Sequence, residues 1–162
     1  MAKKSFKNLD ELELYLQKNV MQILSKDASI ERILAETMSQ AVWDIVYAGY
    51  ISPPNVKDPY ERRGDESGLS DIRNYFITDF FVKDGKVSII FENLTEGTDS
   101  MKGKFIGDMI EYGIKDLWNN SNGAWSEPRP FSQETADRLN ANPTELLGAL
   151  KTALQARGFT VS

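Results

Sequence analysis

The sequence predicts an α+β fold, in which long amphipathic helices pack on a small, mainly antiparallel sheet. Apolar residues recur at helical spacing over residues 9–47 and again near the C-terminus, which predicts helices at both ends of the chain. Between them, an Asp84-Gly85 pair separates two β-rich runs, which predicts a hairpin. The length of 162 residues suits one core, so we expect residues 1–162 to form a single domain.

The N-terminal region predicts two consecutive helices. Asn8-Leu9-Asp10-Glu11 has the form of a capping box, and the apolar stripe after it predicts a helix over residues 9–25. Asp27 or Ser29 is then the expected N-cap of a second helix over residues 30–47. The stripe of this second helix is typical of a helix that faces the core.

The hairpin is expected over residues 75–82 and 86–93, joined by a two-residue type I′ turn at Asp84-Gly85. Because this turn fixes the register, one face of the hairpin should pack on the second helix. The predicted pairs on that face are Val82 with Val87, Phe80 with Ile89, and Thr78 with Phe91.

The other face of the hairpin would carry Ile77, Phe81 and Ile90 beside polar residues. Such a face is too apolar to be fully solvated, so we expect the later chain or a partner protein to cover it.

A long insert, residues 51–74, separates the second helix from the hairpin, because Pro53-Pro54 stops regular structure. Inserts of this length are uncommon within compact domains and are usually functional. Tyr60, Arg62 and Arg63 make it a candidate arm for binding another subunit, since tyrosine and arginine are enriched at protein interfaces. A contact with DNA phosphates and a simple exposed loop are the alternatives.

The C-terminal third is expected to be largely helical. Residues 105–113 fit either a short helix or an edge strand, and Ser132 should cap a helix that ends near residue 140. Asn142-Pro143-Thr144-Glu145 predicts the start of a last helix, which Gly158 should end. Residues 159–161 could add a short final strand, and Phe131 is expected to be buried ahead of its helix.

Composition argues against an enzyme. The chain has no cysteine and no histidine, which excludes thiolate catalysis, cysteine-based zinc sites and the usual serine–histidine nucleophile systems. A carboxylate Mg²⁺ site drawn from Asp65, Glu66 and Asp71 would lie on the insert with no rigid spacing. We therefore expect no catalytic residue, cofactor or metal, with a Mg²⁺-dependent nuclease as a remote alternative.

Charge and hydropathy point away from nucleic acid and membrane as partners. The net charge of −5 disfavours general binding to a phosphate backbone. No apolar run approaches the roughly 20 residues that span a bilayer. The N-terminus lacks the apolar stretch of a signal peptide, so we expect the protein to be made in a cytosol.

Several motifs together resemble the neck, or tail-completion, proteins of long-tailed bacteriophages, also called minor head–tail joining proteins. The resemblance covers roughly residues 30–154. It depends on an amphipathic helix that ends in Val46-Tyr47, on the motifs Tyr60-Glu61-Arg62-Arg63 and Gly68-Leu69-Ser70-Asp71, and on the extended stretch from Trp125 to Phe131.

The resemblance implies a structural virion protein in the head–tail connector, located in the neck of the particle after synthesis in the bacterial cytoplasm. It implies a homo-oligomeric ring that contacts the adaptor, or head-completion, protein on one side and the tail-terminator or tail-tube protein on the other. DNA would pass through the lumen without specific binding. The expected interface residues are Tyr60, Arg62, Arg63, Gly68 and Leu69, to which the apolar hairpin face adds Phe81 and Ile90. An adaptor that forms no ring is the alternative.

Overall fold

The computed structural model describes residues 5–48, 67–98, 102–113 and 127–161. Within these ranges the chain forms helices and a two-stranded antiparallel sheet, which confirms the predicted α+β fold class. No helix in these ranges is long and apolar enough to cross a bilayer.

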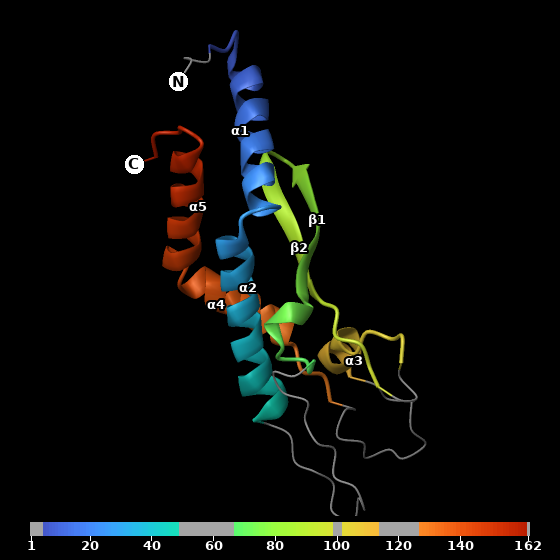
Figure 1. The fold of residues 1–162 in the computed structure, drawn as a ribbon. Coiled ribbons are helices and arrows are strands. Elements are labelled where there is room, and N and C mark those ends of the chain that lie inside the picture. The colour runs from blue at the N-terminus through green and yellow to red at the C-terminus, as the bar shows by residue number, and fades with distance from the viewer. Residues whose placement is uncertain (1–4, 49–66, 99–101, 114–126, 162) are drawn as a thin grey trace, which may run out of the picture.

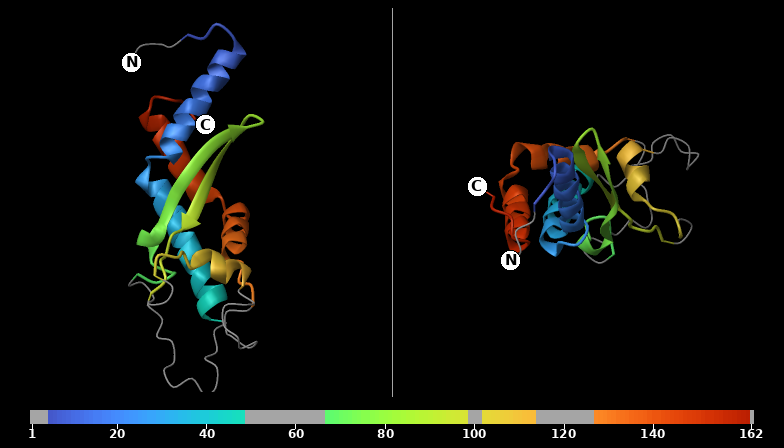
Figure 2. Two further views of the ribbon diagram at one scale, coloured as in Figure 1. Left: turned by 90° about the vertical axis from the view of Figure 1, so that its right-hand side faces the viewer. Right: turned by 90° about the horizontal axis from the view of Figure 1, so that it is seen from above.

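The elements form three layers (Figure 1). Two consecutive helices, α1 (Leu9–Leu24) and α2 (Ala28–Ala41), form the central layer. The hairpin of β1 (Tyr75–Lys83) and β2 (Lys86–Asn93) covers one side of it. The C-terminal helix α5 (Thr144–Ala156) lies on the opposite side, and the view from above in Figure 2 shows the same order.

Both N-terminal helices begin where the sequence predicts. Asn8 Oδ1 accepts the Glu11 N–H at 2.8 Å, and Glu11 Oε2 accepts the Lys7 N–H at 2.7 Å, which closes the capping box one residue earlier than usual. Asp27 Oδ1 accepts the Ser29 N–H at 3.0 Å, so Asp27 is the N-cap of α2 and Ser29 lies within its first turn.

The second helix keeps its predicted length but changes its geometry near the end. The last turn, η1 (Val42–Tyr47), is a π-helix, in which the Ala48 N–H donates to the Trp43 carbonyl at 2.9 Å. The wider turn brings Tyr47 round to the same side as Val42 and Val46, and all three side chains are buried. The sequence pattern did not predict this change.

The hairpin turn and its nearest pairs are confirmed. Asp84 and Gly85 both have positive φ, 52° and 73°, as a type I′ turn requires. Val82 pairs with Val87, and Phe80 pairs with Ile89. The expected burial of this face is wrong near the turn, because Phe80 and Val82 are 38% and 39% exposed.

The register further from the turn differs from the prediction. A bulge between Ile77 and Asp79 leaves Thr78 out of the pairing, so Ile77 instead of Thr78 pairs with Phe91. The bulge reverses the alternation of side chains, which moves Ile77 to the inner face. The prediction failed because it assumed strict alternation along the whole strand.

Two connected clusters form the core. One joins the central helices to α5 and the inner hairpin face through Ile23, Ile30, Leu34 and Ala153, with Ile77, Ile89 and Phe91 packed against it. The other surrounds the end of the second helix and includes Met38, Val42, Val46, Tyr47, Leu69, Tyr75, Ile110 and Phe131. Burying each of the large side chains stabilises the fold by roughly 1.5–3 kcal/mol relative to exposing it.

The ambiguous segment before residue 113 is helical, as α3 (Gly107–Tyr112). A further helix, α4 (Phe131–Ala141), begins one residue before the expected cap Ser132, whose N–H instead donates to Glu111 Oε2 at 3.0 Å. Phe131 is buried, as predicted.

The last helix, α5, begins at Thr144 with Pro143 at its N-cap position, so Asn142 does not serve as the predicted cap. Its end is as predicted: Gly158 has φ of 87°, and its N–H donates to the Gln155 carbonyl. The final strand does not form. Phe159 instead packs near the Tyr15 ring, with 5.8 Å between the ring centroids.

Candidate partner-binding surfaces

A polar anchor holds the end of the predicted insert against the body of the protein. We use this name for residues Gly68–Asp71 together with the side chains that bind their backbone. The Leu69 carbonyl accepts the Asn93 side-chain amide at 2.7 Å and the Tyr75 hydroxyl, and the Ser70 carbonyl accepts the Ser39 hydroxyl at 2.7 Å. These bonds join the anchor to α2, β1 and β2.

The anchor also closes on itself and on the segment that follows the hairpin. Asn74 Nδ2 donates to the Gly68 carbonyl and to Thr95 Oγ1, both at 3.1 Å. Asp71 accepts backbone N–H groups from Ser67 at 2.8 Å and from Arg73 at 3.0 Å, which starts the 3₁₀ turn η2 (Ile72–Asn74). The end of the insert is therefore built as a fixed structure.

Two of the expected interface residues lie in the anchor. Gly68 and Leu69 are buried, and Leu69, at 2% exposure, belongs to the protein's own core. In the monomer their carbonyl groups accept hydrogen bonds that anchor the chain, and their contact with a partner stays a prediction. Tyr60, Arg62 and Arg63 lie outside the described residues, and their contact with a partner stays a prediction.

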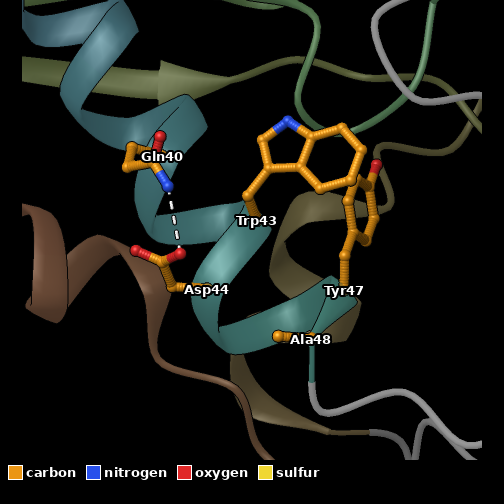
Figure 3. Close-up of a pocket in the computed structure, with 5 residues that line it drawn as sticks. All are labelled: Gln40, Trp43, Asp44, Tyr47 and Ala48. Atoms are coloured by element: carbon orange, nitrogen blue, oxygen red, sulfur yellow. Dashed lines mark hydrogen bonds between the residues drawn. The ribbon is translucent and has the colours of Figure 1, made fainter.

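A second feature is the surface around Trp43, at the end of the second helix. Two shallow depressions, of about 570 and 610 Å³, share Gln40 and Trp43. Figure 3 shows the smaller one: Trp43 and Tyr47 lie together on one side of η1, with their rings edge to face at 4.8 Å, and Gln40 and Asp44 lie on the other. The larger depression extends to Ile72 and Arg73.

The charged groups of the Trp43 surface are paired with one another or with neighbouring helices. The carboxylates and their arginine partners are Glu36 with Arg32 at 3.8 Å, Asp44 with Arg138 at 2.9 Å, and Asp71 with Arg73 at 2.6 Å. Hydrogen bonds from the Arg73 side chain hold the pKa of the Asp71 carboxyl well below its usual range. Such paired groups are poor proton-transfer catalysts, because a general acid or base needs a pKa near the working pH.

The third feature is the outer face of the hairpin, the side turned away from α1 and α2. Phe76, Phe81 and Ile90 lie on this face with exposed fractions of 43%, 42% and 40%. Phe81 and Ile90 thus lie on the outer face, as the sequence predicts, and Phe76 takes the place of Ile77 because of the bulge. Their contact with a partner stays a prediction.

The part of the chain that the structure describes contains no candidate metal site. No cluster of three or more possible ligands occurs within residues 5–48, 67–98, 102–113 and 127–161. Of the three carboxylates considered from the sequence, Asp71 serves the anchor, and Asp65 and Glu66 lie outside these ranges.

Sequence reasoning missed the anchor's polar partners, chiefly Asn93 and Thr95. Asn93 ends β2 and Thr95 follows it, and the sequence marks neither as a buried hydrogen-bonding residue, although Thr95 is only 1% exposed. One signal was available: Asn-x-Thr at the end of an apolar strand supplies side chains that bind nearby backbone groups. The structure shows such a bond, from the Thr95 N–H to Asn93 Oδ1 at 2.9 Å.

Comparison with known proteins gives one decisive match. Residues 8–156, nearly the whole chain, match the YomN family. The chain belongs to the YomN family. The family takes its name from a protein of an SPbeta-like prophage, which makes the chain a phage-associated protein. No curated protein and no solved structure matched it.

Proposed function

We propose that this YomN-family chain is a structural protein of the phage head–tail connector, forming part of the neck ring through which DNA passes. The outer hairpin face carries this proposal, because Phe76, Phe81 and Ile90 remain exposed there, whereas Ile77, Ile89 and Phe91 on the other face pack against the core. Exposed apolar patches on a soluble protein are typical of surfaces that bind other proteins.

A subunit of a closed ring needs two different adhesive surfaces, because its contacts run head to tail. The described residues provide more than one such surface: the outer hairpin face and the region around Trp43, where tryptophan and arginine lie together. The insert with Tyr60, Arg62 and Arg63 would add contacts to the proteins above or below the ring. Family membership and the resemblance to neck proteins support the same role.

The acidic composition fits a conduit for DNA. With a net charge of −5, a ring of these subunits would repel the phosphate backbone and let DNA slide without binding. The role requires no catalysis, in keeping with a chain that has neither histidine nor cysteine.

The proposal is tested by complementing a phage that lacks its own copy of the gene. Wild-type protein should restore joined particles and be present in them. The double variant Phe81→Asp with Ile90→Asp should fold but leave heads and tails separate, whereas Leu147→Asp, at an exposed leucine of α5, should behave as wild type. A parallel variant, Arg62→Ala with Arg63→Ala, tests the insert.

Two outcomes would contradict the proposal. Joined, infectious particles formed without the gene would show that the protein has no part in head–tail joining. Purified wild-type particles that lack the protein would favour an adaptor that acts inside the cell.

A further inference from the structure

We propose that the last turn of the second helix is a conformational switch, which exchanges Tyr47 for Ile45 in the core, and that Arg129 holds it in its π form. This is the form that the structure shows, as η1. In the alternative form, α2 would continue as an α-helix through the same residues. The inference concerns a single chain, so it does not depend on a ring or on the proposed function.

The sequence of this turn suits both forms. Met38 and Tyr47 belong to one buried cluster, although about two and a half turns separate them in an α-helix, where they would face opposite sides. Met38 and Ile45, by contrast, are about two α-helical turns apart, so an α-helix would bury Ile45 beside Met38. Ile45 is only half-buried in the structure. The π-helical turn therefore buries Tyr47 in place of Ile45.

The π form is the less usual of the two. π-helices are rare and occur mostly as single turns within α-helices, frequently at functional sites. Here the Ala48 N–H donates to the Trp43 carbonyl at 2.9 Å, whereas an α-helix would direct it to the Asp44 carbonyl. The acceptor of the Ala48 N–H thus shows which form the turn adopts.

Arg129 is placed to favour the π form. Its guanidinium Nη1 donates at 3.1 Å to the Val46 carbonyl, which belongs to the last turn of the helix, where carbonyl groups lack partners within the helix. The backbone of Arg129 is itself fixed: its N–H donates to the Ile110 carbonyl at 3.0 Å, and its carbonyl accepts the Phe131 N–H at 2.8 Å. Rewinding the turn into an α-helix would turn the Val46 carbonyl away from this fixed donor.

The switch would change the surface around Trp43. In the π form the Tyr47 ring lies edge to face against Trp43, with 4.8 Å between the ring centroids, and Tyr47 is only 5% exposed (Figure 3). In the α form Tyr47 would leave the core, and the depression beside it would lose its present shape. A partner that binds the Trp43 surface as shaped here would therefore favour the π form, because a ligand shifts an equilibrium toward the state that it binds better.

Two variants define the end states, measured by nuclear magnetic resonance of the purified protein. Ile45→Ser makes the α form unfavourable, because it would bury an unpaired hydroxyl, and should keep the Ala48 N–H bonded to the Trp43 carbonyl. Tyr47→Ser makes the π form unfavourable in the same way and should move this bond to the Asp44 carbonyl. Scalar coupling across the hydrogen bond identifies the acceptor in each variant.

The decisive variant is Arg129→Gln, which removes the guanidinium but keeps the backbone hydrogen bonds of this position. Losing one charge-assisted hydrogen bond should raise the ratio of the α form to the π form roughly tenfold or more. The Ala48 amide signal should then move from its wild-type position toward its position in Tyr47→Ser. Relaxation dispersion of this amide detects the α form even as a minor state. Adding Ile45→Ser to Arg129→Gln should return the signal to its wild-type position.

Arg138→Gln is the matched control, because Arg138 is a second half-buried arginine that contacts the same turn. It pairs with the carboxylate of Asp44 at 2.9 Å instead of with a carbonyl of the turn. Its loss should leave the Ala48 amide signal in place.

Four results would overturn the inference. The Ala48 N–H could keep the Trp43 carbonyl as its acceptor in Tyr47→Ser, Arg129→Gln could leave the Ala48 amide as in the wild type, or Arg138→Gln could move it as far. Failure of Arg129→Gln to fold would also count against it, because the guanidinium would then support the whole fold and not the choice between two turns.

Discussion

The polar anchor and the outer hairpin face lie on the same small sheet but are built in opposite ways. In the anchor, backbone and side-chain polar groups from four segments satisfy one another, and Leu69 and Tyr75 beside them are buried. On the hairpin face, large apolar side chains remain exposed, and no layer covers them within the described parts of the chain. The anchor stabilises the monomer, whereas we propose that the hairpin face buries its apolar surface against another protein.

The two regions also differ in how their contacts are distributed along the chain. Thr95 bonds to Gly68 and Asn93 bonds to Leu69 across more than twenty residues, so the anchor forms only when the fold is nearly complete. The hairpin pairs locally around Asp84-Gly85. Substitutions should therefore have different consequences in the two regions.

The largest expected effect comes from a matched pair of phenylalanines. Phe131→Ala removes a side chain that is almost fully buried, and should lower the free energy of unfolding by about 3–5 kcal/mol. Phe81→Ala, on the exposed face, should cost less than about 1 kcal/mol. Urea unfolding of the purified protein measures both. Equal losses would show that Phe81 contributes to the monomer's own core.

A smaller effect is expected within the anchor. Asn74→Ala removes a side chain that bridges the Gly68 carbonyl and the Thr95 hydroxyl, and should cost about 1–3 kcal/mol, because both groups lose a hydrogen bond in a poorly solvated place. Gln40→Ala, on the exposed surface of α2, is the control and should change stability little. Hydrogen exchange should report faster opening of residues 67–75 in the Asn74 variant alone.

The parts of the fold that follow from neighbouring residues could be predicted from the sequence. Asn8 and Glu11 cap α1, Asp84-Gly85 makes the hairpin turn, and Gly158 ends α5, because each needs only a few adjacent residues. The bulge at Thr78 could not be predicted in this way. The bulge brings Ile77 into the cluster of Ile23, Ile30 and Leu34, which come from helices far away in the sequence.

The candidate surfaces show the same division. The apolar outer face could be predicted from the turn and the strand pattern, and Phe81 and Ile90 are indeed exposed. The burial of Leu69 could not, since it depends on Asn93, Tyr75 and the packing of α2. The sequence shows no boundary within the long insert that contains the arginine pair, yet the last residues of the insert pack in the body of the protein.

The next prediction concerns how the stability of the protein depends on pH. Hydrogen bonds from Arg73 hold the pKa of the Asp71 carboxyl below its unfolded value of about 3.9, so its contribution to stability is present above that pH and is lost as the pH falls below it. At neutral pH, Asp71→Asn should cost about 1–2 kcal/mol, a moderate amount because the Arg73 side chain is largely exposed and the pair is screened.

Urea midpoints of the wild type and the Asp71→Asn variant, measured between pH 7 and pH 3, test this linkage. The difference between the two proteins should be constant above about pH 5 and shrink below about pH 4. Taking the difference cancels the other carboxylates, which are common to both chains. A difference that stays constant down to pH 3 would mean that Asp71 is not held in its charged form by the anchor.

The smallest expected effects come from two glycines with positive φ, one at the end of α5 and one in the hairpin turn. Gly158→Ala forces a side chain into positive φ at the end of α5, which should cost about 1 kcal/mol. Gly85→Ala has a similar strain in the hairpin turn, where the added methyl group would be in ordinary van der Waals contact with Glu13 Oε1 at 3.5 Å. Both should lower stability alike, but only Gly85→Ala should also weaken assembly into particles, because only that turn orients Phe81 and Ile90. If Gly158→Ala weakens assembly as much, the hairpin has no special part in it, and the contrast between an anchored region and an adhesive one would have to be abandoned.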